Sequence, residues 1–396
     1  MAKKLKIING RIITPEKIIE NGSLLISDGI ITEISDKEIL TKTDITVDAE
    51  ENFISPGFID IHVHGGGGSD FMDGTIGDFL TIAETHLKYG TTALVPTTLS
   101  AGKENLLHIL DTYRKASQEN VKGAQFLGIH IEGPYFAMSQ KGAQDPRYIR
   151  KPDKNEYSEI IKKTGDIIVR WSAAPELEGA IDFGKYLKAH DILPAIAHTD
   201  AVYEDVARAF ENGYTLATHF YSAMSGVTRR NAFRYAGVIE SVYLIDEIDV
   251  EIIADGVHLP APLLKLIYKI KGPGRTALIT DAMRAAGMRN GESILGSREN
   301  GLKVIVEDGV AKLPDRSSFA GSVATTNRLV RTMIQIAGVP VIEAVRMMTL
   351  TPARIMKIDK HKGSITAGKD GDMLIFDKDI NIQTAIVKGE VLYNKS

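Results

Sequence analysis

The sequence contains no cysteine among its 396 residues. This absence excludes disulfide bonds, thiolate nucleophiles and cysteine-ligated zinc, so any metal ion must be held by histidine and carboxylate side chains. An excess of positive charge is also missing, since 47 basic residues face 51 acidic ones and the formal net charge is −4. Without a basic surface to follow a phosphate backbone, nucleic acid is not expected as a partner.

Long apolar runs are missing as well. No stretch approaches the roughly 18 consecutive apolar residues that a membrane-spanning helix needs, so no membrane partner is expected. The basic start of the chain, residues 1–6, leads into Asn9-Gly10 without the apolar core of a signal peptide. These absences favour the cytoplasm as the location. The remaining composition, 43% hydrophobic and 25% charged, is that of an ordinary globular protein.

Both ends of the chain have the pattern of short strands joined by tight turns. Dipeptides typical of two-residue hairpin turns lie between short apolar runs at Asn9-Gly10, Asp28-Gly29 and Lys388-Gly389. Residues 373–376 form one more short apolar run near the C-terminus. We therefore expect residues 1–56 and 358–396 to join in one small β-sandwich domain.

The middle of the chain, residues 57–357, alternates between β-branched apolar runs and helical patterns. The eight expected strands are residues 58–63, 91–96, 126–131, 167–173, 192–197, 215–218, 250–254 and 276–280. The clearest helical patterns are residues 79–88, 106–115, 203–212 and 261–271. This alternation predicts an α/β fold, a closed (β/α)8 TIM barrel whose strands all end on one face. Residues 291–314 interrupt the pattern and are expected to form an inserted β-hairpin.

Histidine and acidic residues stand at the ends of the expected strands. They are His62 and His64 at the first strand, Glu132 at the third, His198 at the fifth, His219 at the sixth, His258 at the seventh and Asp281 at the eighth. Singly, each has a structural explanation, such as Asp281 as the N-cap of a following helix. Because the strand ends of a barrel meet at its mouth, the whole set is expected to converge on one site.

This set of side chains suits metal-assisted hydrolysis. His62 and His64 are two residues apart in a strand, so both rings point to the same side and can reach one ion. A bound divalent ion polarises a poor electrophile such as an amide and lowers the pKa of water from about 15.7 toward about 7. Asp281 is the candidate carboxylate for moving the proton from water to the leaving nitrogen. Zinc is the expected ion, and iron and manganese suit the same ligands.

An arginine-rich segment, Thr228-Arg229-Arg230-Asn-Ala-Phe-Arg234, follows the sixth strand. One interpretation is a solvated surface. The other is a clamp for an anionic substrate group, because a guanidinium group pairs with phosphate through two hydrogen bonds. The segment begins soon after His219, which places it above the expected site and favours a phosphate contact for Arg230.

Longer motifs surround the candidate residues. They are Asp60-Ile-His62-Val-His64-Gly, His130-Ile-Glu132-Gly-Pro134, Ala197-His198-Thr-Asp200, Thr218-His219-Phe-Tyr-Ser-Ala-Met224, Asp255-Gly-Val-His258 and Thr280-Asp281-Ala-Met283. Together they resemble the N-acetylglucosamine-6-phosphate deacetylases of the amidohydrolase superfamily, over nearly the whole chain. The His-x-His pair alone indicates only the superfamily, whereas the Glu-Gly-Pro and Ala-Met segments are more specific.

The resemblance implies hydrolysis of N-acetyl-D-glucosamine 6-phosphate to D-glucosamine 6-phosphate and acetate. It implies that Glu132, His198 and His219 hold the main metal ion, and that His62 and His64 hold a second ion bridged by the glutamate. It implies that Asp281 is the catalytic acid and base. Implied substrate contacts are Gln144, Ser222, Ala223, Arg230 and His258, with the arginine reaching the phosphate in the neighbouring subunit of a homodimer.

Two departures from the family pattern lie where the sugar phosphate is expected. Ser222 replaces an asparagine, and Arg229-Arg230-Asn231-Ala-Phe stands in place of His-Arg-Glu-Pro-Gly. N-Acetyl-D-galactosamine 6-phosphate or another acylated amino sugar therefore stays open as the substrate. A further alternative is a hydrolase of cyclic amides or N-acyl amino acids, but many of these use a carboxylated lysine where Glu132 stands. A non-catalytic scaffold is the last alternative, and the complete ligand set disfavours it.

Overall fold

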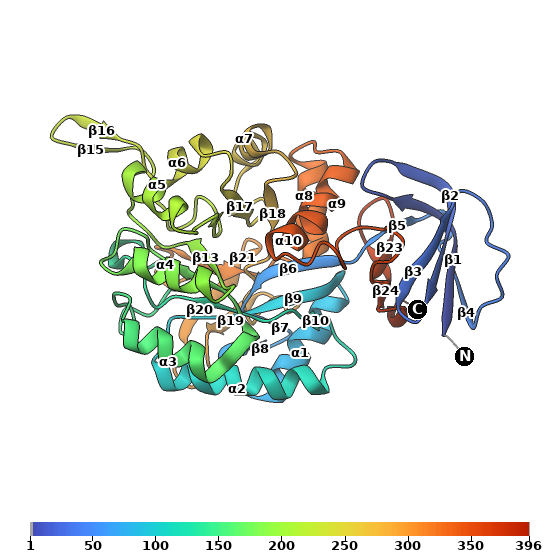
Figure 1. Ribbon diagram of the computed structural model, residues 1–396, viewed down its shortest axis with the longest axis horizontal. Coiled ribbons are helices and arrows are strands. Elements are labelled where there is room, and N and C mark those ends of the chain that lie inside the picture. Colours follow the sequence, from blue (N-terminus) through green and yellow to red (C-terminus); the bar gives the residue numbers. More distant parts are fainter. Residues whose placement is uncertain (1–2, 396) are drawn as a thin grey trace.

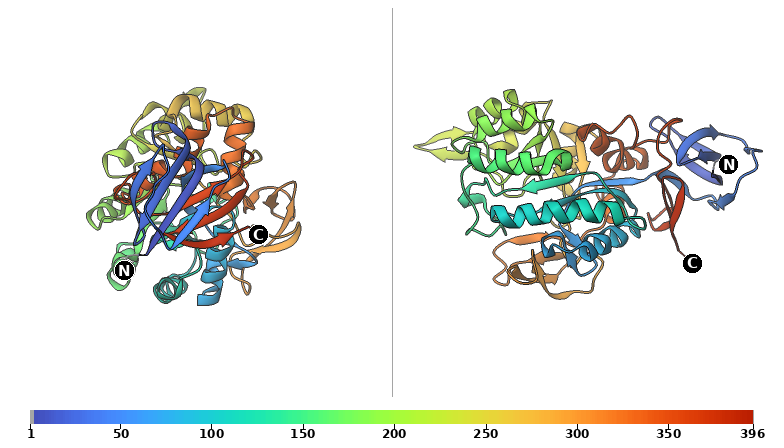
Figure 2. Two further views of the ribbon diagram at one scale, coloured as in Figure 1. Left: turned by 90° about the vertical axis from the view of Figure 1, so that its right-hand side faces the viewer. Right: turned by 60° about the horizontal axis from the view of Figure 1, so that its bottom comes forward.

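The computed structural model describes residues 3–395, which form a barrel and a smaller β domain at one end of it (Figure 1). Both ends of the chain lie in this smaller domain (Figure 2). The outermost residues of the predicted β domain, 1–2 and 396, lie outside the described residues. Within the described part of the chain, no helix is both long enough and apolar enough to cross a membrane.

Eight parallel strands form the barrel, and each pairs with the next along the chain. Their bounds are β6 (Phe58–Val63), β9 (Thr91–Thr98), β11 (Ile129–Glu132), β12 (Ile168–Ala173), β13 (Leu193–Ile196), β14 (Leu216–Ala217), β17 (Asp249–Ile252) and β18 (Thr276–Leu278), with β10 (Gln125–Phe126) preceding β11. A parallel bridge between Val63 and Ala282 joins the first strand to the chain beyond the last. The predicted barrel is confirmed.

Helices surround the barrel. Their bounds are α1 (Ile76–Leu87), α2 (Lys103–Glu119), α3 (Lys154–Thr164), α4 (Ala180–Ala189), α5 (Tyr203–Glu211), α6 (Val238–Leu244), α7 (Ala261–Lys271), α8 (Thr326–Gln335), α9 (Val341–Met348) and α10 (Leu350–Ile355), with 3-10 turns η1 (Phe71–Asp73), η2 (Met138–Gln140) and η3 (Gly165–Ile167). Helix α2 shows why they pack, since Leu106, Ile109, Leu110 and Tyr113 are buried at helical spacing on one face. The four predicted helical patterns correspond to α1, α2, α5 and α7.

The two ends of the chain join in one mixed sheet of eight strands. They are β1 (Lys4–Ile13), β2 (Ile18–Ser27), β3 (Ile30–Ser35), β4 (Ile45–Asp48), β5 (Phe53–Pro56), β23 (Met373–Phe376), β24 (Ile382–Val387) and β25 (Glu390–Asn394). The junction is the antiparallel pairing of β5 with β23. The predicted turns at Asp28-Gly29 and Lys388-Gly389 are both present, and the sheet encloses its own apolar cluster.

The predicted hairpin at Asn9-Gly10 is wrong. Strand β1 runs through this dipeptide without reversing, and its pairing with β2 shifts register there. Asn9 has a positive φ of 55°, and a Cβ atom on Gly10 would lie 2.2 Å from the Ile54 side chain. The glycine therefore serves close packing at a bulge, and not a turn.

Three smaller sheets accompany the barrel in the described part of the chain. The predicted insertion is larger than one hairpin and comprises β19 (Gly291–Leu295), β20 (Leu302–Glu307), β21 (Val310–Lys312) and β22 (Phe319–Ser322). A short pair, β7 (Gly65–Gly66) and β8 (Ser69–Asp70), follows β6. A hairpin of β15 (Thr228–Arg230) and β16 (Phe233–Tyr235) projects from the end of the molecule that lies opposite the β domain (Figure 1).

Candidate metal centre

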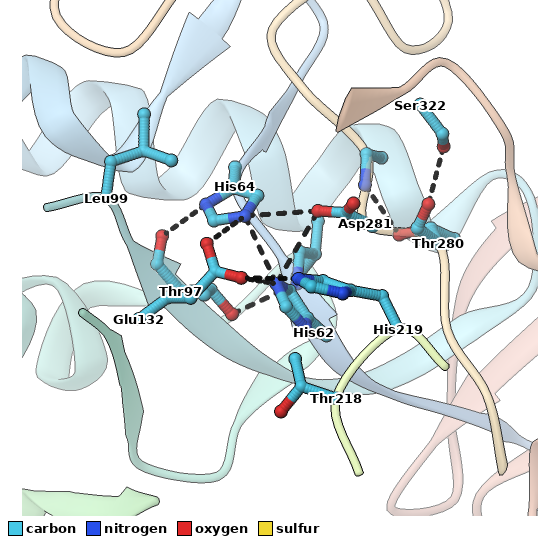
Figure 3. Close-up of polar contacts among 12 residues, drawn as sticks. His62, His64, Thr97, Leu99, Glu132, Thr218, His219, Thr280, Asp281 and Ser322 are labelled. Atoms are coloured by element: carbon cyan, nitrogen blue, oxygen red, sulfur yellow. Dashed lines mark hydrogen bonds and ion pairs between the residues drawn. The ribbon is translucent and has the colours of Figure 1, made fainter. Parts of the chain in front are cut away.

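The residues predicted to bind metal meet at the C-terminal mouth of the barrel, and Figure 3 shows most of them. They form two overlapping groups, His62 with His64 and Glu132, and Glu132 with His198 and His219. Within each group the potential ligand atoms lie within 4.8 Å of one another, and all five side chains are buried. Glu132 belongs to both groups, so its carboxylate stands between two places for a cation.

The two carboxylate oxygens of Glu132 face different imidazoles. Oε1 lies 3.0 Å from Nε2 of His219 and 3.5 Å from Nε2 of both His198 and His62. Oε2 lies 3.5 Å from Nε2 of His64. Four imidazole nitrogens around one anionic carboxylate are a donor set that suits zinc and other divalent transition metals.

The hydrogen bonds of the Nδ1 atoms explain why each ring turns its Nε2 to the centre. Three rings donate from Nδ1 to main-chain carbonyl oxygens, those of Thr97 for His64 (3.2 Å), Gln140 for His198 (2.8 Å) and Ser222 for His219 (3.1 Å). His62 differs, because its Nδ1 faces a side chain, Oε2 of Glu251, at 3.5 Å. An acceptor at Nδ1 fixes the tautomer and leaves the Nε2 lone pair free for a metal ion.

The backbone at the strand ends is strained where it presents these side chains. His198, His219 and Asp281 have positive φ angles of 48°, 30° and 46°. Residues other than glycine rarely adopt this conformation, and such strain concentrates at functional sites. The main chain of Asp281 is held on both sides, since its N–H donates to the carbonyl of His62 (2.9 Å) and its carbonyl accepts from Ser322 N–H (2.8 Å).

Asp281 lies beside the group of His62, His64 and Glu132. Its Oδ1 is 3.1 Å from Nε2 of His64 and 3.5 Å from Nε2 of His62. Burial raises the pKa of Asp281, but the hydrogen bond with His64 and the charge of His62 outweigh burial and lower it below its usual value. The carboxylate is therefore ionised at neutral pH and able to accept a proton. No described helix starts at Asp281, so the N-cap interpretation is wrong.

The charged groups of the centre shift one another's pKa values. Burial raises the pKa of Glu132, but the charge of His62 and hydrogen bonds with His198 and His219 hold it well below its usual range. Burial lowers the pKa of His64, but the hydrogen bond to Asp281 and the charge of Glu132 raise it to about 9. Protons and metal ions therefore compete for the same imidazole nitrogen.

The centre forms the floor of a cavity of about 590 Å³. Four of the predicted substrate contacts line it, namely Gln144, Ser222, Ala223 and His258. Two segments that were not predicted as part of the site also line it, residues 139–143 and, on or next to the inserted sheet, Leu313, Ser317, Ser318, Phe319 and Gly321. The first segment follows the Glu-Gly-Pro motif closely, which is the signal that could have identified Lys141 as a cavity residue.

Gln144 also contacts the carboxylate that the two ligand groups share. Its Nε2 donates to Oε2 of Glu132 at 2.6 Å, and its Oε1 accepts from the N–H of Ser100 at 2.8 Å. The second bond fixes which end of the amide faces Glu132. The side chain thus orients a carboxylate oxygen, and its predicted contact with substrate stays a prediction.

Arg230 does not line the cavity of its own chain. It lies on the projecting β15–β16 hairpin, whose turn residues Asn231 and Ala232 both have positive φ, as a two-residue hairpin turn requires. Its guanidinium group stacks over the ring of Tyr235 at 5.3 Å. Phe233 on the same hairpin is 73% exposed. The predicted phosphate contact of Arg230 therefore stays a prediction.

Residues 53–392 match the model of the Amidohydrolase family. The chain is 32% identical to N-acetylglucosamine-6-phosphate deacetylase of Bacillus subtilis (strain 168), over 99% of this chain and 98% of that protein. It is 30% identical to N-acetylgalactosamine-6-phosphate deacetylase of Escherichia coli O157:H7, over 96% and 97%. A solved structure of mutant N-acetyl-D-glucosamine-6-phosphate deacetylase from Mycobacterium smegmatis, in complex with N-acetyl-D-glucosamine-6-phosphate, is similar with a TM-score of 0.89, 28% identity and coverage of 99% and 100%.

Proposed function

The chain belongs to the amidohydrolase family, among its N-acetylglucosamine-6-phosphate deacetylases, and from this premise we propose that it hydrolyses N-acetyl-D-glucosamine 6-phosphate to D-glucosamine 6-phosphate and acetate. The observation that carries the proposal is the pair of buried His/Glu groups sharing Glu132, with ionised Asp281 beside them. The cavity above them has the size of a small-molecule site.

Glu132, His198 and His219 would hold the main ion, and His62 and His64 would hold a second ion together with the same glutamate. Zinc is our proposal for both ions, because four imidazoles and one carboxylate are ligands that zinc accepts. When bound, the metal supplies a Lewis acid for the acetyl carbonyl and lowers the pKa of the attacking water.

Asp281 moves the proton. Its Oδ1 lies next to Nε2 of His64 and of His62, so we propose that it accepts a proton from the attacking water and later donates it to the departing amine. His258 orients the sugar from the cavity wall. Its Nδ1 is engaged by Oδ2 of Asp255 at 2.8 Å, which leaves Nε2 free for a substrate hydroxyl or phosphate oxygen.

The phosphate group is recognised across a homodimer in our proposal. Arg230 does not line the cavity of its own chain and stands on a hairpin that projects away from the barrel (Figure 1). Exposed Phe233 and Val227, 73% and 56% accessible, give this hairpin an apolar surface that a second copy would cover. The hairpin of one protomer would then supply Arg230 to the site of its partner.

We expect Arg230→Ala to lower kcat/KM for the 6-phosphorylated substrate by about 10- to 100-fold, because the variant lacks a charge-assisted hydrogen bond to the phosphate. Hydrolysis of N-acetyl-D-glucosamine, which has no phosphate, should be unchanged. The measurement is acetate release from both sugars by the native enzyme and the variant. An equal loss on both sugars, or no loss on either, would remove Arg230 from phosphate recognition.

We expect Phe233→Asp to convert the dimer to monomers, because it places a charge where an apolar contact is proposed. Sedimentation velocity at several protein concentrations measures the change. Leu244→Asp is the matched control, since Leu244 is 70% exposed but lies outside the hairpin. A native protein that sediments as a monomer would contradict the dimer.

The corresponding N-acetyl-D-galactosamine 6-phosphate is the second candidate substrate. The similarity to the Escherichia coli O157:H7 enzyme and the departures at Ser222 and residues 229–231 favour keeping it in the assay. The two sugars differ only at one hydroxyl group, so a comparison of kcat/KM under identical metal loading decides between them. Metal analysis of the same preparation tests the centre, and hydrolysis of neither sugar by metal-loaded protein would overturn the proposed function.

A further inference from the structure

A buried ion pair lies inside the barrel beneath the metal centre. Arg170 on β12 and Glu251 on β17 are both fully buried, with no exposed side-chain surface. Arg170 Nη2 donates to Oε2 of Glu251 at 2.7 Å, and Nη1 contacts the other carboxylate oxygen, Oε1. The two charges are thus joined through both oxygens of the carboxylate.

Stability alone does not account for this pair. The interior of a barrel of this type is normally filled by branched apolar side chains, as the cluster of Ile59, Ile61, Ala195 and Leu216 fills it here. Removing two charges from water has a large desolvation cost, and apolar residues in place of a buried ion pair are often as stable or more stable. A role beyond folding is therefore worth testing.

The pair contacts the metal centre through one imidazole. Oε2 of Glu251, the oxygen that accepts from Arg170 Nη2, faces Nδ1 of His62 at 3.5 Å. The other three metal-binding imidazoles use main-chain carbonyls at Nδ1, so among the four only His62 relies on a side chain that a mutation can remove.

Arg170 is itself held in place. Its Nη2 donates to Oγ1 of Thr218 at 2.7 Å, and its Nη1 donates to the carbonyl of Ile61 at 3.2 Å. The contacts thus link β6, β12, β17 and the end of β14, which stand around the barrel. Because the guanidinium group is planar and permanently charged, it fixes the plane of the Glu251 carboxylate.

We propose that Glu251, held by Arg170, is a positioning residue that orients His62 and so makes His62, His64 and Glu132 a functional second metal site. This proposal rests on the proposed function only in taking the protein to be a metal-dependent deacetylase. Glu251 contacts neither the ion nor the substrate in this proposal and acts through His62. Outer residues that orient metal-binding histidines typically contribute about 10- to 100-fold to metal affinity.

The experiment counts zinc ions per chain. Protein stripped of metal is titrated with zinc chloride, and elemental analysis after gel filtration gives the stoichiometry. Native protein should hold two ions per chain, and Glu251→Gln should hold one, with the second bound about 10- to 100-fold more weakly. His62→Ala should reproduce this loss.

Two further variants separate positioning from folding. Arg170→Met with Glu251→Met removes both charges together, so no unpaired buried charge is left, and it should also hold one ion. Asp249→Asn is the matched control, because Asp249 lies on the same strand but pairs with Arg354 and Arg275. It should lower the melting temperature of the metal-free protein and still hold two ions.

The proposal is overturned if the Glu251→Gln and double variants bind two ions with native affinity, or if the native chain itself binds one. If Glu251→Gln does not fold, the double variant alone decides. Deacetylation by the native enzyme is measured separately, so failure of the proposed function would be recognised independently of the metal count.

Discussion

Asp281→Asn is expected to lower kcat by about 10²- to 10⁴-fold, the usual contribution of a general acid and base. Asparagine keeps the shape of the side chain but cannot accept and return a proton. The main-chain hydrogen bonds that hold residue 281, to the carbonyl of His62 and from the N–H of Ser322, are unaffected by this change. Metal content and KM should therefore stay close to native values, while steady-state acetate release falls.

The same chemical change elsewhere provides the control. Asp205 caps the first turn of α5 and does not line the cavity, so Asp205→Asn should keep native kcat. Elemental analysis must accompany the kinetics, because Asp281 lies close to the predicted metal ligands His62 and His64. Full turnover by a metal-loaded Asp281→Asn enzyme would exclude it as the proton carrier, and loss of metal would instead identify it as a ligand.

Glu132→Ala is expected to remove both metal ions and nearly all activity. Glu132 is the residue common to the two ligand groups, whereas each histidine belongs to only one. Without a metal ion the pKa of the attacking water returns from about 7 to about 15.7, so we expect a loss of more than about 10⁴-fold in kcat/KM. Zinc per chain, acetate release and thermal unfolding with added zinc chloride measure the effect.

His62→Ala provides the comparison, because it should remove one ion and leave His198, His219 and Glu132 in place. The melting temperature of native protein should rise when zinc is added, since binding to the folded state stabilises it. That of Glu132→Ala should not respond. Two ions in Glu132→Ala protein would mean that the two histidine pairs bind independently of the shared carboxylate.

The barrel could be predicted from the sequence because its signals are local and repeated. Short β-branched runs recur along the chain with helical patterns between most of them, and all eight runs became strands. The prediction of a hairpin at Asn9-Gly10 was wrong because the structure there depends on contacts between distant parts of the chain. A favourable turn sequence was overridden by packing against Ile54, a residue that only the tertiary structure brings to Gly10.

The convergence of the metal-binding candidates could also be predicted from the sequence. Residues at strand ends converge whatever lies between them, so His62, Glu132 and His198 could be grouped without coordinates. The buried ion pair beneath them could not be predicted from the sequence. Arg170 and Glu251 are far apart in the chain, and the sequence shows each only as a charged residue in a strand, with nothing to say that the two form a pair. Likewise, no local signal shows that the Gln144 amide faces Glu132.

The anchoring of His219 by a main-chain carbonyl has a consequence for how such enzymes change over evolutionary time. Residue 222 supplies that carbonyl, and its side chain, a serine here, lies in the cavity lining. Exchanging the side chain alters the wall of the cavity but leaves the carbonyl oxygen that orients the imidazole. The side chain at this position can therefore change over evolutionary time while His219 keeps its orientation.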